Sequence, residues 1–388
     1  FILASSGTFS AQSADVIEIP VWVYDKDEFV SGLTIDDFEV YEDGTLQKVN
    51  TLYLVREQSI VREEKLGPAS PNLYRNFFLL YQTMDWDSKL GDTIEYLFQS
   101  LLLPGDTMTL VTPMKSYSLT PDALAKRSKA DLTKEMQQIL RKDIQQGGGN
   151  YRSTLKDLRR IVRAIGGDRN AVEADMETDI GSSFGLEMQL DRYKQSLMKL
   201  ENLRLLDQKK LLEFAEILRK QPGRNFVIFF YQREFRPEIS SSALGNMMSI
   251  YQDSPNVLND LQDLFQFYTR DKVLNADLIR RAFADASLTF SFIFMDKEST
   301  YIFGANMREQ SEDIFPLFSS IARATGGVAY SSRNAAMSFQ SAAEASKEHY
   351  LLTYVPSKPE ADGSFREITV RIKNKDYDVS CRAGYYAR

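Results

Sequence analysis

Alternating apolar and polar positions mark the two ends of the chain, whereas its middle alternates between short apolar runs and stretches with helical spacing. Over residues 15–66, β-branched residues recur at alternate positions between turn-forming Asp, Glu and Gly, which favours half-buried strands. Residues 348–388 return to this pattern. Because neither end has enough strands to bury one face of a sheet, we expect the two ends to join in one small β-sandwich.

Residues 72–347 have the pattern of an α/β domain. Continuous apolar runs at 76–81, 225–231 and 288–295 are typical of strands that helices cover on both faces. Stretches with helical spacing separate these runs. The alternation predicts a doubly wound, mostly parallel sheet of the Rossmann type, inserted between the two halves of the sandwich.

Several segments interrupt this order. Two prolines and a glycine within 67–71 predict a linker, and the three glycines at 147–149 predict a flexible break. The acidic stretch 173–179 is expected to form a loop. Leucine-rich spacing over 185–220 predicts one long helix, which could pack against a neighbouring subunit or simply cover the core.

The composition excludes several kinds of site. The 388 residues include one cysteine, Cys381, and one histidine, His349, so an internal disulfide and a Cys-based zinc site are ruled out. A Ser-His-Asp triad would have to use His349, for which we expect a structural or surface role. Cys381 lies in a strand pattern and is expected to be buried. With no nucleophile–base pair visible, the sequence argues against an enzyme.

The charge pattern bears on partners. The net charge of −7 disfavours nucleic-acid binding by the surface as a whole. Lysines and arginines concentrate between residues 126 and 169, where they could attract an acidic partner or an anionic lipid, although a solvated helix face is the commoner explanation. This basic run consists of Lys126, Arg127, Lys129, Lys134, Arg141, Lys142, Arg152, Lys156, Arg159, Arg160 and Arg163.

The first residues suggest export. Residues 1–14 begin with an apolar segment followed by small residues, which is similar to the tail of a secretory signal peptide; a plain disordered terminus is the other interpretation. No apolar run approaches the roughly 18 residues that cross a membrane. We therefore expect an exported protein, periplasmic or extracellular, without a transmembrane span.

Several short motifs lie near the two ends of the chain. They are Val21-Trp-Val-Tyr-Asp25, Asp37-Phe-Glu-Val-Tyr-Glu42-Asp-Gly44, Thr325-Gly-Gly-Val-Ala-Tyr330, His349-Tyr-Leu-Leu-Thr-Tyr354, Asp362-Gly-Ser-Phe365-Arg and Arg382-Ala-Gly-Tyr385. These motifs resemble those of the bacterial von Willebrand factor type A-related proteins. Leu103-Pro-Gly-Asp106 and the glycines at 147–149 fall in the family's order between them, so the resemblance covers nearly the whole chain.

The resemblance implies a von Willebrand A-like α/β domain with a metal ion at the carboxyl edge of its sheet. The family's site uses an Asp-x-Ser-x-Ser loop after the first strand, a Thr after the Gly-rich break and an Asp-Gly after the fourth strand. Here the loop reads Tyr81, Thr83, Asp85 in one register and Gln82, Met84, Trp86 in the other, so it lacks the leading Asp.

The other two positions of the family's site also differ. Asn150 stands where the Thr is expected, and Gln232-Arg233, or Tyr231-Gln232 after a shift, stands where Asp-Gly is expected. Fewer carboxylates weaken the attraction for a divalent ion, and an arginine repels it. We therefore predict a degenerate site that binds no metal and no cofactor. The alternative is a rearranged metal site formed by Asp85, Asp87 and Asn150.

Together these features predict a non-catalytic interaction module or scaffold. We expect it to be a subunit of a larger envelope or extracellular assembly, homo- or hetero-oligomeric, that binds protein partners without a metal. The alternative is an adhesion module that depends on Mg²⁺ or Mn²⁺. Tyrosine and arginine are enriched at binding hot spots, but the tyrosines and glutamines could equally fill the vacated pocket. The predicted partner surface is Tyr81, Gln82, Thr83, Asp85, Asn150, Tyr231, Gln232 and Arg233.

Overall fold

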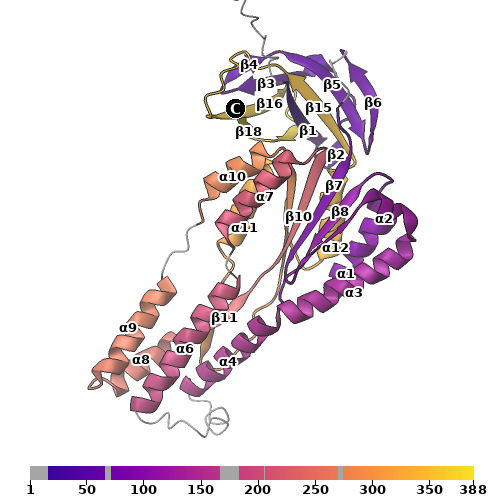
Figure 1. Cartoon of the computed structure of the whole chain (residues 1–388). Coiled ribbons are helices and arrows are strands. Elements are labelled where there is room, and N and C mark those ends of the chain that lie inside the picture. Colours follow the sequence, from indigo (N-terminus) through magenta and orange to yellow (C-terminus); the bar gives the residue numbers. More distant parts are fainter. Residues whose placement is uncertain (1–15, 66–70, 167–182, 205, 270–273) are drawn as a thin grey trace, which may run out of the picture.

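The computed structural model describes residues 16–65, 71–166, 183–204, 206–269 and 274–388 (Figure 1). The expected export segment, most of the linker and the acidic stretch 173–179 lie outside these residues. Within the described part of the chain, no helix is long and apolar enough to cross a membrane. Three regions follow one another along the long axis of the molecule: a β-sandwich, an α/β domain and a helical extension.

A mostly parallel sheet forms the centre of the α/β domain. Its order is β14-β12-β10-β7-β8-β9, and only the edge strand β9 runs antiparallel to its neighbour. The three apolar runs of the sequence supply β7, β10 and β12, so the predicted α/β fold with a mostly parallel sheet is confirmed. The strands are β7 (Arg75–Gln82), β8 (Thr107–Val111), β9 (Ser116–Leu119), β10 (Arg224–Gln232), β12 (Thr289–Met295) and β14 (Ala329–Ser332).

Helices cover both faces of this sheet. One face packs against α1 (Ser88–Tyr96), the π-helical turn η2 (Leu97–Leu101), α3 (Lys129–Gly147) and α12 (Ala335–Glu344), with the short α2 (Pro121–Lys126) beside them. The other face packs against α7 (Gln208–Lys220), α10 (Ala276–Asp285) and α11 (Ile314–Ala324). Burial on both faces explains why the strands are continuously apolar.

The helical extension lies beyond the carboxyl ends of the strands (Figure 1). It has its own apolar core, to which four helices and a small antiparallel sheet contribute. These elements are α4 (Gly149–Ile165), α6 (Ser183–Arg204), α8 (Ser241–Ile250), α9 (Pro255–Thr269), β11 (Phe235–Ile239) and β13 (Ala305–Glu309). The extension therefore covers part of the sheet edge where a ligand site was expected.

Two predictions about this region need correction. The glycines at 147–149 do separate two helices, but the break is the single residue Gly148, because α3 ends at Gly147 and α4 begins at Gly149. A Cβ on Gly148 would lie 2.1 Å from the backbone oxygen of Met84, so glycine is needed there for close approach.

The predicted helix over 185–220 is two helices, α6 and α7. The Asp207 carboxylate caps the second by accepting bonds from the backbone N–H groups of Lys209 and Lys210. The apolar residues of α6 pack in the extension, whereas those of α7 pack on the sheet.

The two ends of the chain meet in a pair of antiparallel sheets that enclose one apolar core. One sheet has the order β17-β1-β15-β5-β6, with β2 paired to β1, and the other has the order β18-β16-β3-β4. The 3₁₀ turn η1 (Ile35–Asp37) leads into β3. The strands are β1 (Ile17–Asp25), β2 (Glu28–Phe29), β3 (Phe38–Glu42), β4 (Thr45–Gln47), β5 (Val49–Arg56), β6 (Ser59–Glu64), β15 (Glu348–Tyr354), β16 (Phe365–Ile372), β17 (Asp378–Cys381) and β18 (Gly384–Tyr386).

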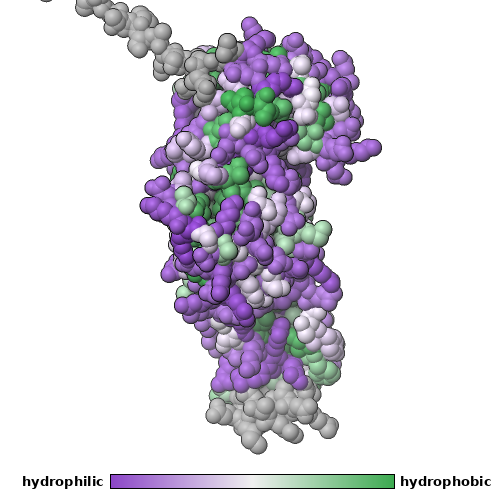
Figure 2. Space-filling view, turned by 90° about the vertical axis from the view of Figure 1, so that its right-hand side faces the viewer, coloured by the Kyte–Doolittle hydropathy of each residue, from purple (hydrophilic) through white to green (hydrophobic). Residues whose placement is uncertain are grey.

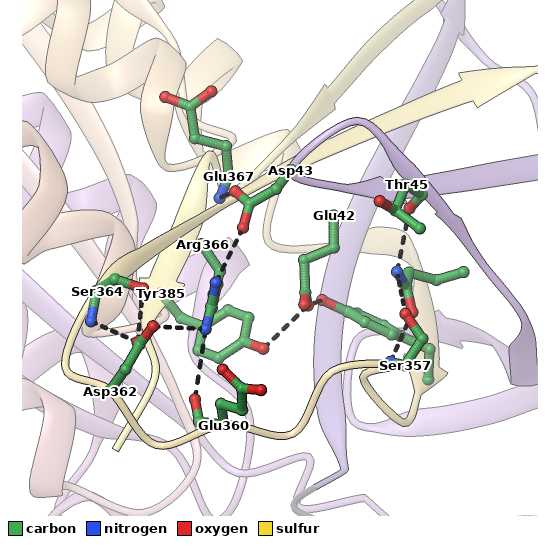
Figure 3. Close-up of polar contacts among 12 residues, drawn as sticks. Glu42, Asp43, Thr45, Ser357, Glu360, Asp362, Ser364, Arg366, Glu367 and Tyr385 are labelled. Carbon is green, nitrogen blue, oxygen red and sulfur yellow. Dashed lines mark hydrogen bonds and ion pairs between the residues drawn. The ribbon is translucent and has the colours of Figure 1, made fainter.

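Polar contacts hold the terminal motifs together (Figure 3). The buried Glu42 carboxylate accepts hydrogen bonds from the hydroxyls of Tyr354 at 2.5 Å and Tyr385 at 2.9 Å. The Arg366 guanidinium contacts Asp362 at 3.0 Å and Asp43 at 3.4 Å. These contacts thus join Glu42 and Asp43, near one end of the chain, to Tyr354, Arg366 and Tyr385 near the other.

Candidate functional site

The candidate site lies at the carboxyl edge of the parallel sheet, where β7 and β10 are neighbours. The chain leaves β7 towards β8 on one side and β10 towards β12 on the other. Loops that diverge in this way leave a crevice at the end of the two strands, which is the usual ligand position in open α/β sheets. The loops after β7, β10 and β12 and the first turn of α4 supply the side chains described below.

Lys297, which follows β12, lies between two carboxylates at this edge. Its Nζ is 2.6 Å from Oδ2 of Asp85, in the loop after β7, and 3.8 Å from Oε2 of Glu234, after β10. The Arg152 guanidinium of α4 adds a second cation 3.8 Å from Oδ1 of Asp85. Positive charge from two separate elements therefore neutralises the carboxylates of the edge.

Glu234 is the buried member of this group. Its Oε2 accepts a hydrogen bond of 2.7 Å from the Tyr151 hydroxyl, and its Oε1 has no hydrogen-bond partner. Burial raises the pKa of Glu234 to about 7, an increase that the nearby Asp85 reinforces and that Lys297 and Tyr151 oppose. This carboxyl group therefore changes its charge near neutral pH.

Gln232 and Arg233 hold the loops in place. The Gln232 Oε1 accepts bonds from the backbone N–H groups of Met84 at 3.2 Å and Asp85 at 3.1 Å, which fixes the loop after β7. Arg233 lies over the Phe294 ring at 5.1 Å and forms ion pairs with Asp296 and Glu309. Both side chains therefore position other groups of the edge.

The remaining predicted partner-binding residues lie in different environments. Tyr81 is buried on one face of the sheet, stacked on Phe230 at 4.5 Å, and Tyr231 is buried on the other face. The two tyrosines therefore add no aromatic surface to the edge. Gln82 is half-buried, and Asn150 is exposed in the first turn of α4.

Several polar atoms at the edge lack partners among the described residues. The Oγ1 of the fully buried Thr83 has no hydrogen bond, nor do the side-chain oxygen and nitrogen of Gln310. The backbone N–H of Gln310 donates to the backbone carbonyl oxygen of Glu234 at 2.8 Å, so the two residues are neighbours through their main chains. Unpaired polar atoms cost stability when buried, so Thr83 and Gln310 add an energetic cost at this edge.

The acidic groups at this edge fit a divalent ion poorly. In the described part of the chain, no three His, Cys, Asp or Glu side chains are grouped as metal ligands would be. Asp85 is paired with Lys297, and the Asp87 carboxylate caps α1 by accepting a bond from the Lys89 backbone N–H. The two acidic residues of the alternative metal site therefore have other partners.

His349 and Cys381 lie in the sandwich. Both ring nitrogens of His349 lack hydrogen bonds, and its ring lies 5.7 Å from that of Trp22. Burial, reinforced by Arg224 and Arg75, holds the pKa of His349 well below its usual value. Burial also raises the pKa of the Cys381 thiol to about 11. These side chains are therefore a neutral imidazole and a protonated thiol at neutral pH.

Lys297, Glu234 and Tyr151 belong to the edge but were not among the residues predicted from the sequence. Lys297 comes two residues after the apolar run of β12, so the positional rule that identified the loops after β7 and β10 could have identified it too. Glu234 comes directly after Arg233, but no sequence pattern indicates that it is buried. Tyr151 follows Asn150, and its hydrogen bond to Glu234 joins residues 83 positions apart, which no local pattern indicates.

No family model, no curated protein and no solved structure matches this chain.

Proposed function

We propose that this chain is a von Willebrand A-like interaction module whose carboxyl sheet edge binds a protein partner without a metal ion. The observation that carries the proposal is the Lys297 ammonium group, 2.6 Å from Asp85 and 3.8 Å from Glu234. The chain itself supplies positive charge at the place where the family resemblance implies a divalent ion. An ion entering there would be repelled by Lys297 and Arg152.

The same edge supports a non-catalytic role. Glu234, whose pKa is close to neutrality, is 3% exposed, and one of its oxygens is bonded to Tyr151. A general base must come within hydrogen-bond distance of a substrate proton, which this burial hinders. His349 and Cys381 belong to β15 and β17 of the sandwich and cannot assist at the edge.

We also propose export and membership in a larger envelope or extracellular assembly. Export is supported by the residue pattern of 1–14 alone. Assembly is supported by the helical extension, which adds a second core that the parallel sheet does not need for its own coverage. The family resemblance favours both.

Site-specific photo-cross-linking tests the proposal. A photoreactive residue at the exposed Asn150 is expected to cross-link a partner protein in cells that produce the chain, with or without a chelator. The matched control is the exposed Lys358, in the loop after β15 of the sandwich, which should give no adduct.

Each other outcome overturns part of the proposal. An adduct at Asn150 that disappears with EDTA would support metal-dependent adhesion instead. Equal adducts at both positions, or none at Asn150, would contradict a partner site at this edge. Thermal unfolding of the purified chain with Mn²⁺ provides an independent check, because an ion that binds the folded state must raise its melting temperature.

A further inference from the structure

A groove between α1 and α3 opens next to the candidate site. Its volume is about 350 Å³, and Trp86, which directly follows Asp85, forms part of its wall. The remaining lining residues are Ser88, Gly91, Asp92, Lys134, Gln137, Gln138 and Arg141. The groove is thus continuous with the loop that Gln232 and Lys297 hold in place.

One wall of the groove is a single face of α3. Lys134, Gln137, Gln138 and Arg141 have the spacing i, i+3, i+4 and i+7, which places their side chains on one side of a helix. The Gln137 side-chain N–H donates to the carbonyl oxygen of Gly91 at 2.9 Å and so joins α3 to α1 within the groove. A Cβ on Gly91 would lie 3.6 Å from the Trp86 ring and 3.7 Å from Gln137, so the missing side chain leaves space between them.

The groove carries uncompensated positive charge. In the part of the chain that the structure describes, neither Lys134 nor Arg141 lies within ion-pair distance of a carboxylate. The one carboxylate of the lining, Asp92, is paired with Lys89 at 3.3 Å. In a chain whose net charge is −7, two exposed and unpaired cations in one groove favour an anionic occupant.

The spacing of the two cations favours a peptide segment. Lys134 and Arg141 are seven positions apart, which is about 10 Å along a helix. Three residues of extended chain in the polyproline II conformation, at about 3.1 Å each, span that distance and bring positions i and i+3 to the same side. Trp86 and Gly91 lie beside Gln137, between the two cations along the sequence of α3. The face that carries these helices, on the right in Figure 1, is mostly hydrophilic with only small apolar patches (Figure 2), which favours charged contacts over a broad apolar interface.

We propose that the α1–α3 groove binds an extended acidic segment of the partner protein, with two carboxylates separated by about two residues and an apolar side chain against Trp86. This inference rests on the proposed function and specifies the chemistry of its partner. Lys134 and Arg141 bind the carboxylates, and the indole ring of Trp86 contacts the apolar side chain. Tryptophan is a frequent anchor of such contacts.

Titration with a labelled glycine–serine peptide that carries one Glu-Leu-Leu-Glu segment tests the inference. We expect saturable binding with a Kd below about 1 mM, read by fluorescence anisotropy. Charge reversal by Lys134→Glu or Arg141→Glu should weaken binding about tenfold or more. Lys142→Glu is the matched control, because this exposed neighbour on α3 does not line the groove, and it should change the Kd less than about twofold.

The tryptophans supply a second readout. The chain has two, and Trp22 is buried in the sandwich, so a change of indole fluorescence on peptide addition that Trp86→Phe abolishes reports on the groove. Absence of binding would overturn the inference. Equal weakening by Lys142→Glu would do the same, as would equal binding of inorganic phosphate or of DNA, because each indicates unspecific attraction of anions.

Failure here is distinguishable from failure of the proposed function. A cross-link from Asn150 that persists while the peptide does not bind would keep the partner site at the sheet edge and remove the groove from it. Loss of both would remove both.

Discussion

Each end of the parallel sheet holds a buried carboxylate, and the two differ in how many hydrogen bonds they accept. At the amino end, Asp106 receives four hydrogen bonds: two from Arg75, one from the Gln58 side chain and one from the Leu103 backbone N–H. At the carboxyl end, Glu234 receives one, from Tyr151, and one of its oxygens has no hydrogen bond.

The number of hydrogen bonds that each carboxylate accepts separates a group whose role is structural from one with bonding capacity left. A fully bonded buried ion pair fixes the fold and leaves no capacity for a ligand. A buried carboxylate with an unpaired oxygen costs stability and keeps an acceptor position that no described residue fills. Asp106 belongs to a motif on which the family resemblance rests, whereas Glu234 does not, so the motif reflects the architecture and does not locate the site.

The largest expected effect lies at the amino end. Asp106→Ala leaves the Arg75 guanidinium buried without a counter-charge, which should lower the free energy of unfolding by about 4 kcal/mol. The matched variant at the carboxyl end is Asp85→Ala. Its carboxylate is about one-third exposed, so its loss should cost less than about 1 kcal/mol.

Urea unfolding of the two variants at neutral pH measures this contrast. A similar loss of stability in both variants would contradict the contrast, because it would mean that Asp85 contributes as much to folding as Asp106 does.

The second prediction concerns the pH dependence of Glu234. Its folded-state pKa of about 7 exceeds the usual value of 4.5, so the folded state binds the proton more tightly than the unfolded state. Stability therefore falls as the pH rises from about 4.5 to 7. Glu234→Gln, which is neutral at every pH, should be more stable than the wild type at pH 8 by about 3 kcal/mol, and nearly equal to it at pH 4.

Chemical unfolding at several pH values measures this difference. The groups that face Glu234 are Lys297, Asp85 and Tyr151, from three different elements, and all remain in the variant. Glu360→Gln, at an exposed position of the sandwich, is the control and should follow the wild-type curve. A constant difference between Glu234→Gln and the wild type at all pH values would show that the carboxyl group is not perturbed.

A third carboxylate, Glu42 in the sandwich, extends the comparison to the other domain. It accepts hydrogen bonds from Tyr354 and Tyr385 and should behave like Asp106 rather than Glu234. Tyr354→Phe removes one bond to a buried carboxylate and should cost about 2 kcal/mol. Tyr41→Phe is the control: its hydroxyl donates to the half-buried Glu39 at 3.0 Å in the same sandwich, and its loss should lower stability much less than Tyr354→Phe does.

Thermal or urea unfolding distinguishes the two tyrosine variants. Equal losses of stability would mean that the hydrogen bond between Tyr354 and Glu42 stabilises the sandwich no more than the Tyr41–Glu39 contact does.

The fold could be predicted where burial determines the residue type. Strands covered on both faces must be apolar along their whole length, and Phe77 and Phe226, paired side by side in β7 and β10, illustrate this requirement. Composition could not reveal why Gly148 is a glycine, because a glycine needed for close approach to Met84 is identical in sequence to one in a flexible loop. Nor could spacing show that α6 and α7 pack in different cores.

The candidate site could be predicted only in part. The positional rule for open α/β sheets led to Asp85 and Gln232, which the structure brings together through the backbone N–H of Asp85. Lys297 pairs with Asp85 across 212 positions of the chain, and no local pattern indicates such a partner. Residue types at the strand ends were therefore enough to locate the edge. Which charges pair there could be seen only from the contacts between elements in the structure.

The smallest expected effect tests whether Lys297 takes the place of a metal ion. Lys297→Ala leaves the carboxylates of Asp85 and Glu234 facing the same space with only Arg152 beside Asp85. We expect the variant to gain weak binding of Mn²⁺, with a stabilisation of about 1.4 kcal/mol at ten times the Kd, whereas the wild type gains none. Thermal unfolding with increasing Mn²⁺, and with EDTA as the reference, measures both proteins.

The control for this test is Lys89→Ala, which removes an exposed lysine that pairs with Asp92 on α1 and should not create a metal response. A melting temperature that rises with Mn²⁺ in the wild type would contradict the metal-free edge. A response in neither protein would mean that the carboxylates at the carboxyl edge are too few or too far apart to hold an ion, so that Lys297 balances charge without replacing a metal. Only a response confined to Lys297→Ala supports the idea that a tethered ammonium group has replaced the ion, because only then is the site intact apart from the lysine.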